Sequence, residues 1–261
     1  MNRRQFTALS SATLLPPLAA AYEPASVVDA MPGTLPLLFT VPHDGAEFLG
    51  LFPHRTQGAT VRDLGTRELA ERVAALLHQQ LGHRPYLVVA KFSRKHLDAN
   101  RSEADAMESP AMLPAYRAYH DHVAAYVAQI RKAFPSGALL IDVHGQSQEP
   151  GTTFRGTRAG LTVKRLLGRF GPAALQGPDS IFGQLAAKGY AVNPAADAAS
   201  MREDPRFAGG YTVFTYGSHR PDGIDAIQFE FGGQHRSNPR LPEDFAAALV
   251  GFMTAFDLLP K

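Results

Sequence analysis

One stretch, from Ala138 to Gly145, constrains the fold more than any other part of the chain. It reads ALLIDVHG and follows a turn-forming Pro-Ser-Gly at 135–137, which predicts a buried strand of an α/β sheet. Asp142 and His144 near its end are two residues apart, so their side chains point the same way. Sites in open α/β sheets lie at the carboxyl ends of strands. The stretch therefore predicts either a polar, hydrogen-bonded strand end or part of a functional site.

A second stretch repeats this design. Residues 37–41, LLFTV, predict another buried strand, and they lead directly into Pro42-His43-Asp44-Gly45. Each of the two strands thus ends in a histidine that is followed closely by a glycine. This repetition favours a site over a merely polar strand end.

The remaining elements alternate between helices and strands. Amphipathic patterns predict helices over 63–81, 111–133 and about 242–257, and Asp63 could be the N-cap of the first. Other expectations are a strand over 85–90, a loop and hairpin over 145–162, helical patches over 163–188 and an irregular segment over 189–210. In a further strand, Gln228 and Glu230 share one face, and a buried glutamate is costly without a partner.

Composition excludes several kinds of site. The chain has 261 residues, enough for one large domain, and no cysteine, so disulfides, thiolate metal sites and thiol nucleophiles are excluded. Any metal site must use histidine and carboxylate ligands. The formal net charge is +2 and there is no run of basic residues, so no nucleic-acid partner is indicated.

The N-terminus predicts export. Residues 1–21 contain Arg3-Arg4-Gln5-Phe6, a mildly apolar stretch and an alanine-rich end, which is typical of a twin-arginine-type signal peptide. The stretch is too short to give a stable membrane span. We expect a leader over 22–36 and a single domain over 37–261, exported by the twin-arginine machinery to the periplasm or the medium.

The strand ends together supply residues typical of a catalytic metal site. His43, His144 and Glu230 lie at strand ends, with Glu47 and Asp63 nearby in the sequence. Two histidines and one carboxylate are a common catalytic zinc set that leaves a position for water. A further carboxylate would serve as the general base.

The loop after the third strand adds positive charge. Asp98, Asn100 and Arg101 make a plausible anion pocket, because an arginine fork beside an amide suits a carboxylate. Arg94 and Arg101 offer charge for an oxyanion and for a substrate carboxylate. The alternative for this loop is a solvated, charged turn.

At these residues the chain resembles the N-formylglutamate amidohydrolases, a family similar to zinc carboxypeptidases and aspartoacylases. The resemblance is carried, in order along the chain, by residues 42–45, 94–101, 141–145 and 209–211 with 228–230. It implies a three-layer α/β/α sandwich around a mixed, mostly parallel sheet of the phosphorylase/hydrolase-like kind.

The resemblance also implies roles for individual residues. His43, His144 and Asp63 would bind Zn²⁺, with Glu47 as the alternative to Asp63. Carboxypeptidases use His-x-x-Glu, but Ala46 stands at that spacing and Glu47 comes one position later. The other implied roles are a general base at Glu230, polarisation of the scissile carbonyl by Arg94, substrate-carboxylate binding by Asn100 and Arg101, and support of the ligands by Asp142 and Asp98.

The function implied is metal-dependent hydrolysis of the amide bond of an N-formyl or N-acyl amino acid, a small carboxylated amide. Two alternatives remain open from the sequence. One is a carboxypeptidase-like peptidase, which would need a groove open to a longer chain. The other is a periplasmic binding protein that captures carboxylated metabolites without chemistry, although such a protein has no need of Glu230.

Overall fold

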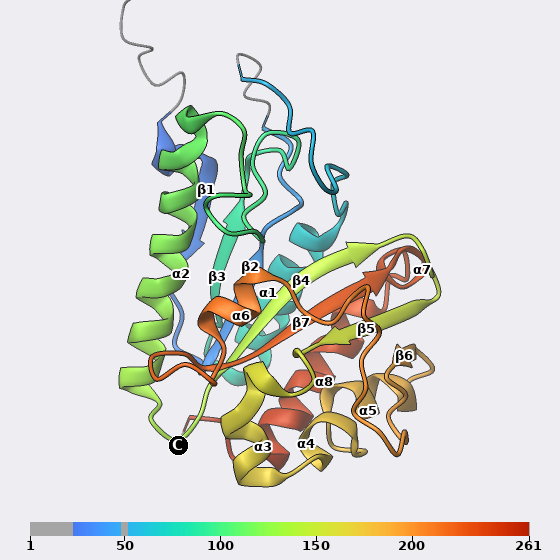
Figure 1. The fold of residues 1–261 in the computed structure, drawn as a ribbon. Coiled ribbons are helices and arrows are strands. Elements are labelled where there is room, and N and C mark those ends of the chain that lie inside the picture. The colour runs from blue at the N-terminus through green and yellow to red at the C-terminus, as the bar shows by residue number, and fades with distance from the viewer. Residues whose placement is uncertain (1–22, 48–51, 261) are drawn as a thin grey trace, which may run out of the picture.

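A seven-stranded mixed sheet runs through the protein in the order β1-β3-β2-β4-β7-β5-β6 (Figure 1). The computed structural model describes residues 23–47 and 52–260, so the expected signal peptide, 1–21, lies outside the described residues. The strands are β1 Val28–Met31, β2 Leu37–Val41, β3 Tyr86–Ala90, β4 Leu139–Gln146, β5 Thr152–Gly156, β6 Ala191–Asn193 and β7 Asp225–Gly232.

The centre of the sheet is parallel. Strands β3, β2, β4 and β7 run in one direction, whereas β1 pairs antiparallel with β3 and β5 pairs antiparallel with β7. This confirms the predicted mixed, mostly parallel sheet. Because β2, β4 and β7 are parallel neighbours, their carboxyl ends meet at one edge, where the histidines and Glu230 were expected.

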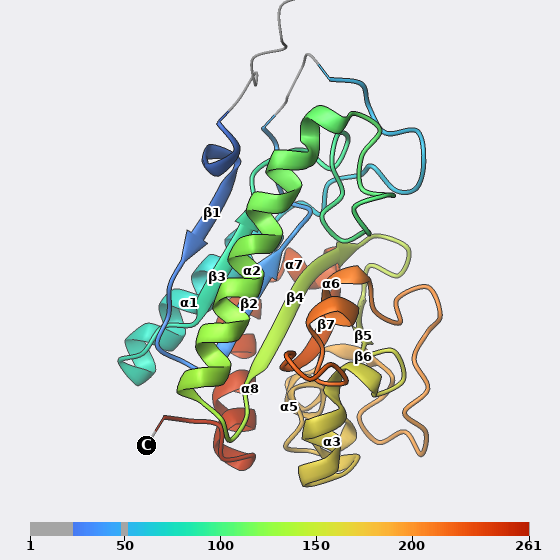
Figure 2. The ribbon, with the colours of Figure 1, turned by 60° about the vertical axis from the view of Figure 1, so that its left-hand side comes forward.

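Helices cover both faces of the sheet, which confirms the three-layer α/β/α arrangement. Figures 1 and 2 show α2, Leu113–Ala133, on one face, with α1, Thr66–Leu81, and α8, Leu241–Ala255, on the other. Shorter helices occupy the connections: η1 Pro24–Val27, η2 Pro110–Met112, η3 Leu161–Val163, α3 Lys164–Phe170, α4 Ala173–Gln176, α5 Ile181–Ala187, α6 Tyr211–Tyr216 and α7 Gly233–Arg236. In the described part of the chain, no helix combines the length and the apolar character needed to cross a membrane.

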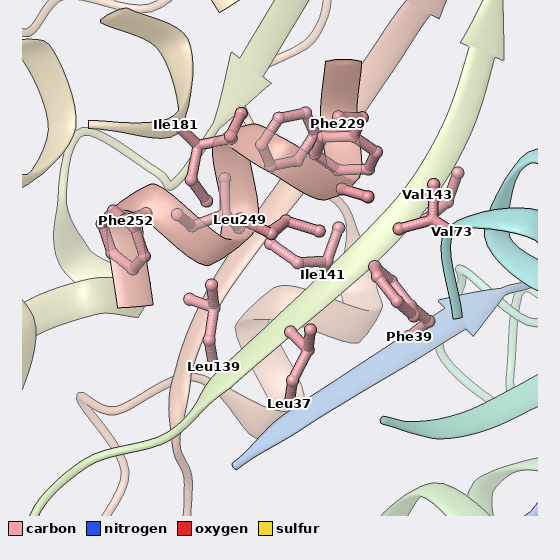
Figure 3. Close-up of a cluster of buried hydrophobic side chains, with 14 of the residues drawn as sticks. Leu37, Phe39, Val73, Leu139, Ile141, Val143, Ile181, Phe229, Leu249 and Phe252 are labelled. Carbon is pink, nitrogen blue, oxygen red and sulfur yellow. The ribbon is translucent and has the colours of Figure 1, made fainter. Parts of the chain in front are cut away.

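The two faces of β4 have different chemistry. Leu139, Ile141 and Val143 belong to the core between the sheet and helices α1 and α8 (Figure 3). Since side chains alternate along a strand, Asp142 and His144 lie on the opposite face, the one that α2 covers. The apolar core therefore holds β4 in the register that presents both polar side chains to the site.

Three elements differ from the sequence-based expectations. The expected hairpin over 145–162 is wrong: β5 pairs with β7 and β6, because both edges of β4 are already paired with β2 and β7. The segment expected as a leader contains the edge strand β1, and the expected irregular segment contains the short strand β6.

The first long helix begins three residues later than expected. Its N-cap is Gly65, with φ 86°, and no side chain caps it. The possible N-cap role of Asp63 is therefore wrong, and the Asp63 side chain is available for other contacts.

Candidate active site

Two histidines and one aspartate from separate segments converge at the carboxyl edge of the sheet. His43 follows β2, His144 lies in β4, and Asp63 precedes α1. The two Nδ1 atoms are 3.0 Å apart, and each is 3.3 Å from Oδ2 of Asp63. All three side chains are buried. They form a group whose ligand atoms are close enough together to hold one metal ion.

The far nitrogen of each imidazole faces a carboxylate. Nε2 of His43 is 2.7 Å from Oδ1 of Asp98, and Nε2 of His144 is 2.8 Å from Oδ2 of Asp142. Asp142 is itself fixed by the hydroxyl of Thr40, which donates to Oδ1 at 2.6 Å. When the carboxylates accept the Nε2 protons, the Nδ1 lone pairs point toward Asp63, which is the usual arrangement behind metal-binding histidines.

This donor set fits a zinc ion. When both Nε2 atoms carry the protons, three electron-pair donors face one another, and a bound cation would relieve their repulsion. In tetrahedral zinc with bonds of about 2.0–2.1 Å, neighbouring ligand atoms are about 3.3–3.4 Å apart. The observed separations of 3.0–3.3 Å are close to that value.

The charges of the group agree with a cation site. Burial disfavours the charged form of His144, but Asp142 and Asp63 outweigh burial and raise its pKa well above the ordinary value. Burial also opposes ionisation of Asp63, but the hydrogen bonds to His144 and His43 outweigh it and lower its pKa. Without a metal, the group therefore retains a proton on an imidazole beside a charged carboxylate.

Glu47, the alternative third ligand, lies elsewhere. Its carboxylate pairs with Lys91 at 3.0 Å, and its side chain is 45% exposed. The later start of α1 instead leaves Asp63 pointing between the imidazoles, where it also accepts the backbone N–H of Gly145 at 3.2 Å. Of the two candidates, the structure brings only Asp63 to the histidines.

Glu230 lies directly beside His144 in the β4–β7 ladder. Its Oε1 accepts a hydrogen bond from Nε2 of Gln228 at 2.9 Å. Burial raises the pKa of Glu230, while the neighbouring His144 opposes that rise. A partly buried carboxylate next to the ligand group, but outside it, has the environment of a general base.

The loop residues expected to bind substrate line a cleft of about 700 Å³ together with Glu230. Arg94 and Arg101 both donate to Oδ2 of Asp98, at 3.1 and 3.2 Å. Asn100 accepts the backbone N–H of Thr212 at 2.8 Å. The loop is therefore a built wall of the cleft rather than a solvated turn, and Asp98 holds its arginines.

Two residues of the site were not predicted. Arg55 is buried and lies 3.5 Å from Asp98, where it compensates the carboxylate together with Arg94 and Arg101. Nothing in its loop sequence indicated this. Gln228 connects the Gly210 N–H, at 2.7 Å, with Glu230, and its shared strand face with Glu230 was the available signal.

Comparison with known proteins adds independent findings. The family model described as N-formylglutamate amidohydrolase matches residues 110–234, a range that contains His144 and Glu230. A search of curated proteins finds no match.

Two solved structures share the fold. The crystal structure of N-formylglutamate amidohydrolase from Ralstonia eutropha JMP134 has a TM-score of 0.57 and 15% identity, covering 89% of this chain and 98% of that one. A gene product of Agrobacterium tumefaciens has a TM-score of 0.55 and 16% identity, covering 88% and 94%. At these identities the likeness shows the fold.

Proposed function

We propose that the protein, whose residues 110–234 match the N-formylglutamate amidohydrolase family model, uses zinc to hydrolyse the amide bond of an N-formyl or N-acyl amino acid. One observation carries the proposal: His43, His144 and Asp63 converge through Nδ1, Nδ1 and Oδ2, with a separate carboxylate, Glu230, beside them. That arrangement would supply three metal ligands and a base, with His43, His144 and Glu230 at the ends of the neighbouring strands β2, β4 and β7 and Asp63 in the loop before α1.

The three ligands would hold the ion, and the acids behind them would fix its position. Asp98 and Asp142 would accept hydrogen bonds from the Nε2–H groups of His43 and His144. The unprotonated Nδ1 atoms would then face the metal ion. Zinc bound there would supply Lewis acidity, which lowers the pKa of a water and polarises a carbonyl.

Glu230 performs the proton transfers. Its carboxylate accepts a proton from the attacking water and then donates it to the leaving nitrogen. Gln228 holds Oε1 of Glu230 through its amide N–H. The raised pKa of Glu230 helps it to carry the proton between the two steps.

The arginines of the cleft meet the negative charges of the substrate. Arg94 would stabilise the oxyanion, and Arg101 with Asn100 would bind the substrate carboxylate. All three line the cleft that contains Glu230. The substrate is therefore a small amide with a free carboxylate, so an amidated analogue should be hydrolysed poorly.

The proposal is tested by metal analysis of the purified protein, followed by a turnover screen. N-formyl and N-acyl amino acids are compared in free-carboxylate and amidated forms, with peptides as a further group. Bound zinc and hydrolysis confined to the free-carboxylate forms would support the proposal. Release of C-terminal residues from peptides would favour a peptidase, and tight binding without turnover by the zinc-loaded protein would favour a binding protein.

We also propose that the protein is exported through the twin-arginine pathway, based on its Arg3-Arg4-Gln5-Phe6 motif. N-terminal sequencing of protein recovered from the periplasm or medium tests it. A mature chain that begins near residue 22 is the expected result. An intact N-terminus in the cytoplasm, with no exported protein, would contradict export and leave the catalytic proposal unaffected.

A further inference from the structure

A second cavity lies at the end of the sheet opposite the candidate active site. It has a volume of about 400 Å³ and is lined by the turn, residues 134–138, that joins α2 to β4. Residues of α3 and the start of β7 form the other side. Figures 1 and 2 show the end of α2, the start of β4 and α3 together at this end of the molecule. The cavity is therefore separate from His144 and Glu230, which lie near the other ends of β4 and β7.

Three arginines line this cavity. Arg131 lies in the last turn of α2, and Arg165 and Arg169 are four residues apart in α3. Like charges at this spacing on a helix repel. Within the described residues, their guanidinium groups donate to backbone carbonyls, and none of them forms an ion pair. The repulsion is therefore not relieved by acidic side chains at hydrogen-bond distance.

Backbone carbonyls hold two of the guanidinium groups side by side. Nη2 of Arg131 and Nη2 of Arg165 both donate to the carbonyl oxygen of Pro221, at 2.8 and 2.9 Å. Arg165 also donates from Nη1 to the carbonyl oxygen of Gly223 at 2.9 Å. A neutral carbonyl fixes the position of a guanidinium without cancelling its charge. An arginine also has five N–H donors, so Arg131 retains several for a ligand.

The Pro-Ser-Gly turn at 135–137 places the third guanidinium. Arg169 donates from Nη1 to the carbonyl oxygen of Ser136, and its Cζ lies 4.5 Å from the ring centroid of Phe170. Gly137 has a φ of 152°, and a Cβ there would be 2.3 Å from Nη1 of Arg169. Glycine at 137 therefore leaves the room that this arginine occupies at the cavity.

One carboxylate, that of Asp225, also lines the cavity. Asp225 is buried, and its Oδ1 accepts the hydroxyl of Ser218 at 2.6 Å and the N–H of Leu166 at 3.0 Å. It faces three guanidinium groups, so the lining keeps an excess of two positive charges. Phe134 and Ile224 add apolar surface between the charged groups.

We propose that this cavity is a second binding site, which takes the phosphate group of a small molecule. A phosphate group carries about two negative charges near neutral pH, which matches the excess on the lining. Paired guanidinium forks suit phosphate oxygens, which accept two parallel N–H bonds. The volume is within the range of small-molecule sites, and the apolar surface of Phe134 and Ile224 would contact the organic part of the ligand.

Calorimetric titration tests this site with inorganic phosphate, phenyl phosphate and succinate, a dicarboxylate of similar charge. The wild type should bind both phosphate compounds, phenyl phosphate more tightly, and succinate more weakly than either. Arg131→Gln should weaken phosphate binding by about 10- to 100-fold, from the usual strength of hydrogen bonds to charged groups. Arg117→Gln is the matched control, because Arg117 is on the same helix but pairs with Glu103 at 3.3 Å.

Two comparisons keep the test decisive. Arg131→Lys keeps the charge but not the planar fork, so it should bind phosphate with intermediate affinity even if the glutamine variant fails to fold. Zinc-loaded and chelator-treated protein should bind phosphate equally, since the cavity lies at the opposite end of β4 from His144.

Four results would overturn the phosphate site. They are no phosphate binding by the wild type, unchanged affinity in folded Arg131→Gln and Arg131→Lys, an equal loss in Arg117→Gln, or succinate bound as tightly as phosphate. Loss of phosphate binding on removal of zinc would also overturn it, because the anion would then occupy the metal site. None of these results bears on amide hydrolysis.

Discussion

At the scale of single residues, the site depends on which nitrogen of each histidine carries a proton. Asp142 contacts Nε2 of His144, and Thr40 holds the other oxygen of Asp142. With a metal ion bound, this chain of contacts would leave Nδ1 of His144 as an electron-pair donor beside Asp63. The carboxylates behind the histidines therefore help to fix the orientation and protonation of the two imidazoles.

Asp142→Asn should weaken zinc binding by about 10- to 100-fold, because a neutral amide no longer favours the His144 tautomer with its proton on Nε2 and no longer makes the imidazole a stronger electron-pair donor. Competition with a coloured chelator measures the affinity. Asp44→Asn is the control, since Asp44 is also buried and adjacent to His43 but accepts hydrogen bonds from Arg62 and the Arg67 backbone instead. An equal loss of affinity in both variants would mean that Asp142 has no specific role.

At the scale of elements, the site is assembled by close contacts between strand ends. Gly45, two residues after His43, lies so near the end of β3 that a Cβ would be 2.2 Å from the carbonyl oxygen of Phe92. A residue with a side chain would therefore clash at this position of the His-Gly pattern, whereas glycine fits. It allows the chain after β2 to pass beside β3 and to place His43 opposite His144.

Gly45→Ala should lower both the melting temperature and the zinc content, because backbone atoms must move to admit the methyl group. Calorimetry and metal analysis of the same preparation measure the two effects. Gly168→Ala in α3 provides the control: its Cβ would meet nothing within 4 Å, so a helical alanine there should be neutral or slightly stabilising. Unchanged zinc content in Gly45→Ala would show that the strand ends need no close approach.

Helix α2 supports the loop that contains Asn100 and Arg101 through His120. Its Nε2 lies 3.0 Å from the carbonyl oxygen of Ala99, and its Nδ1 lies 2.9 Å from the hydroxyl of Tyr216. Burial lowers the pKa of His120 to about 4, although the Ala99 hydrogen bond opposes this. The unfolded chain therefore takes up this proton first as the pH falls. The stability that His120 contributes should be present above about pH 6.5 and lost between about pH 6.5 and 4.

Denaturant unfolding across that pH range tests this prediction. His120→Gln should show a shallower loss of stability than the wild type, by at most about 1.4 kcal/mol per pH unit. His122→Gln, two residues along the same helix, serves as the comparison. Identical pH dependence in the wild type and His120→Gln would contradict the assignment.

At the scale of the whole molecule, two kinds of feature could be predicted from the sequence. They are the elements with a clear local hydrophobic pattern and the shared edge at which parallel strands end. Apolar strands ending in His43, His144 and Glu230 predicted one shared edge, and the structure has it. The sequence left the third ligand open between Asp63 and Glu47, because the spacing of residues along a loop does not determine where their side chains point. That choice depends on where α1 begins and on the Lys91 that pairs with Glu47.

Long-range pairings explain what could not be predicted. The position of β5 follows from β7 occupying the edge of β4, which no local pattern encodes. Similarly, the pairing of Arg155 with Glu203 joins residues 48 positions apart, and Arg55 reaches Asp98 across 43 positions. Each pairing depends on tertiary packing, so neither the arginines nor the acids indicate their partners in the sequence.

Glu230→Gln tests whether Glu230 is the general base of a zinc amidohydrolase. The neutral amide keeps the shape and remains outside the ligand group, so zinc content should equal that of the wild type. The turnover number should fall by about 10²- to 10⁴-fold. Glu47→Gln, at an exposed acid paired with Lys91, should leave both quantities unchanged. Near-full turnover by zinc-loaded Glu230→Gln would show that Glu230 is not the general base.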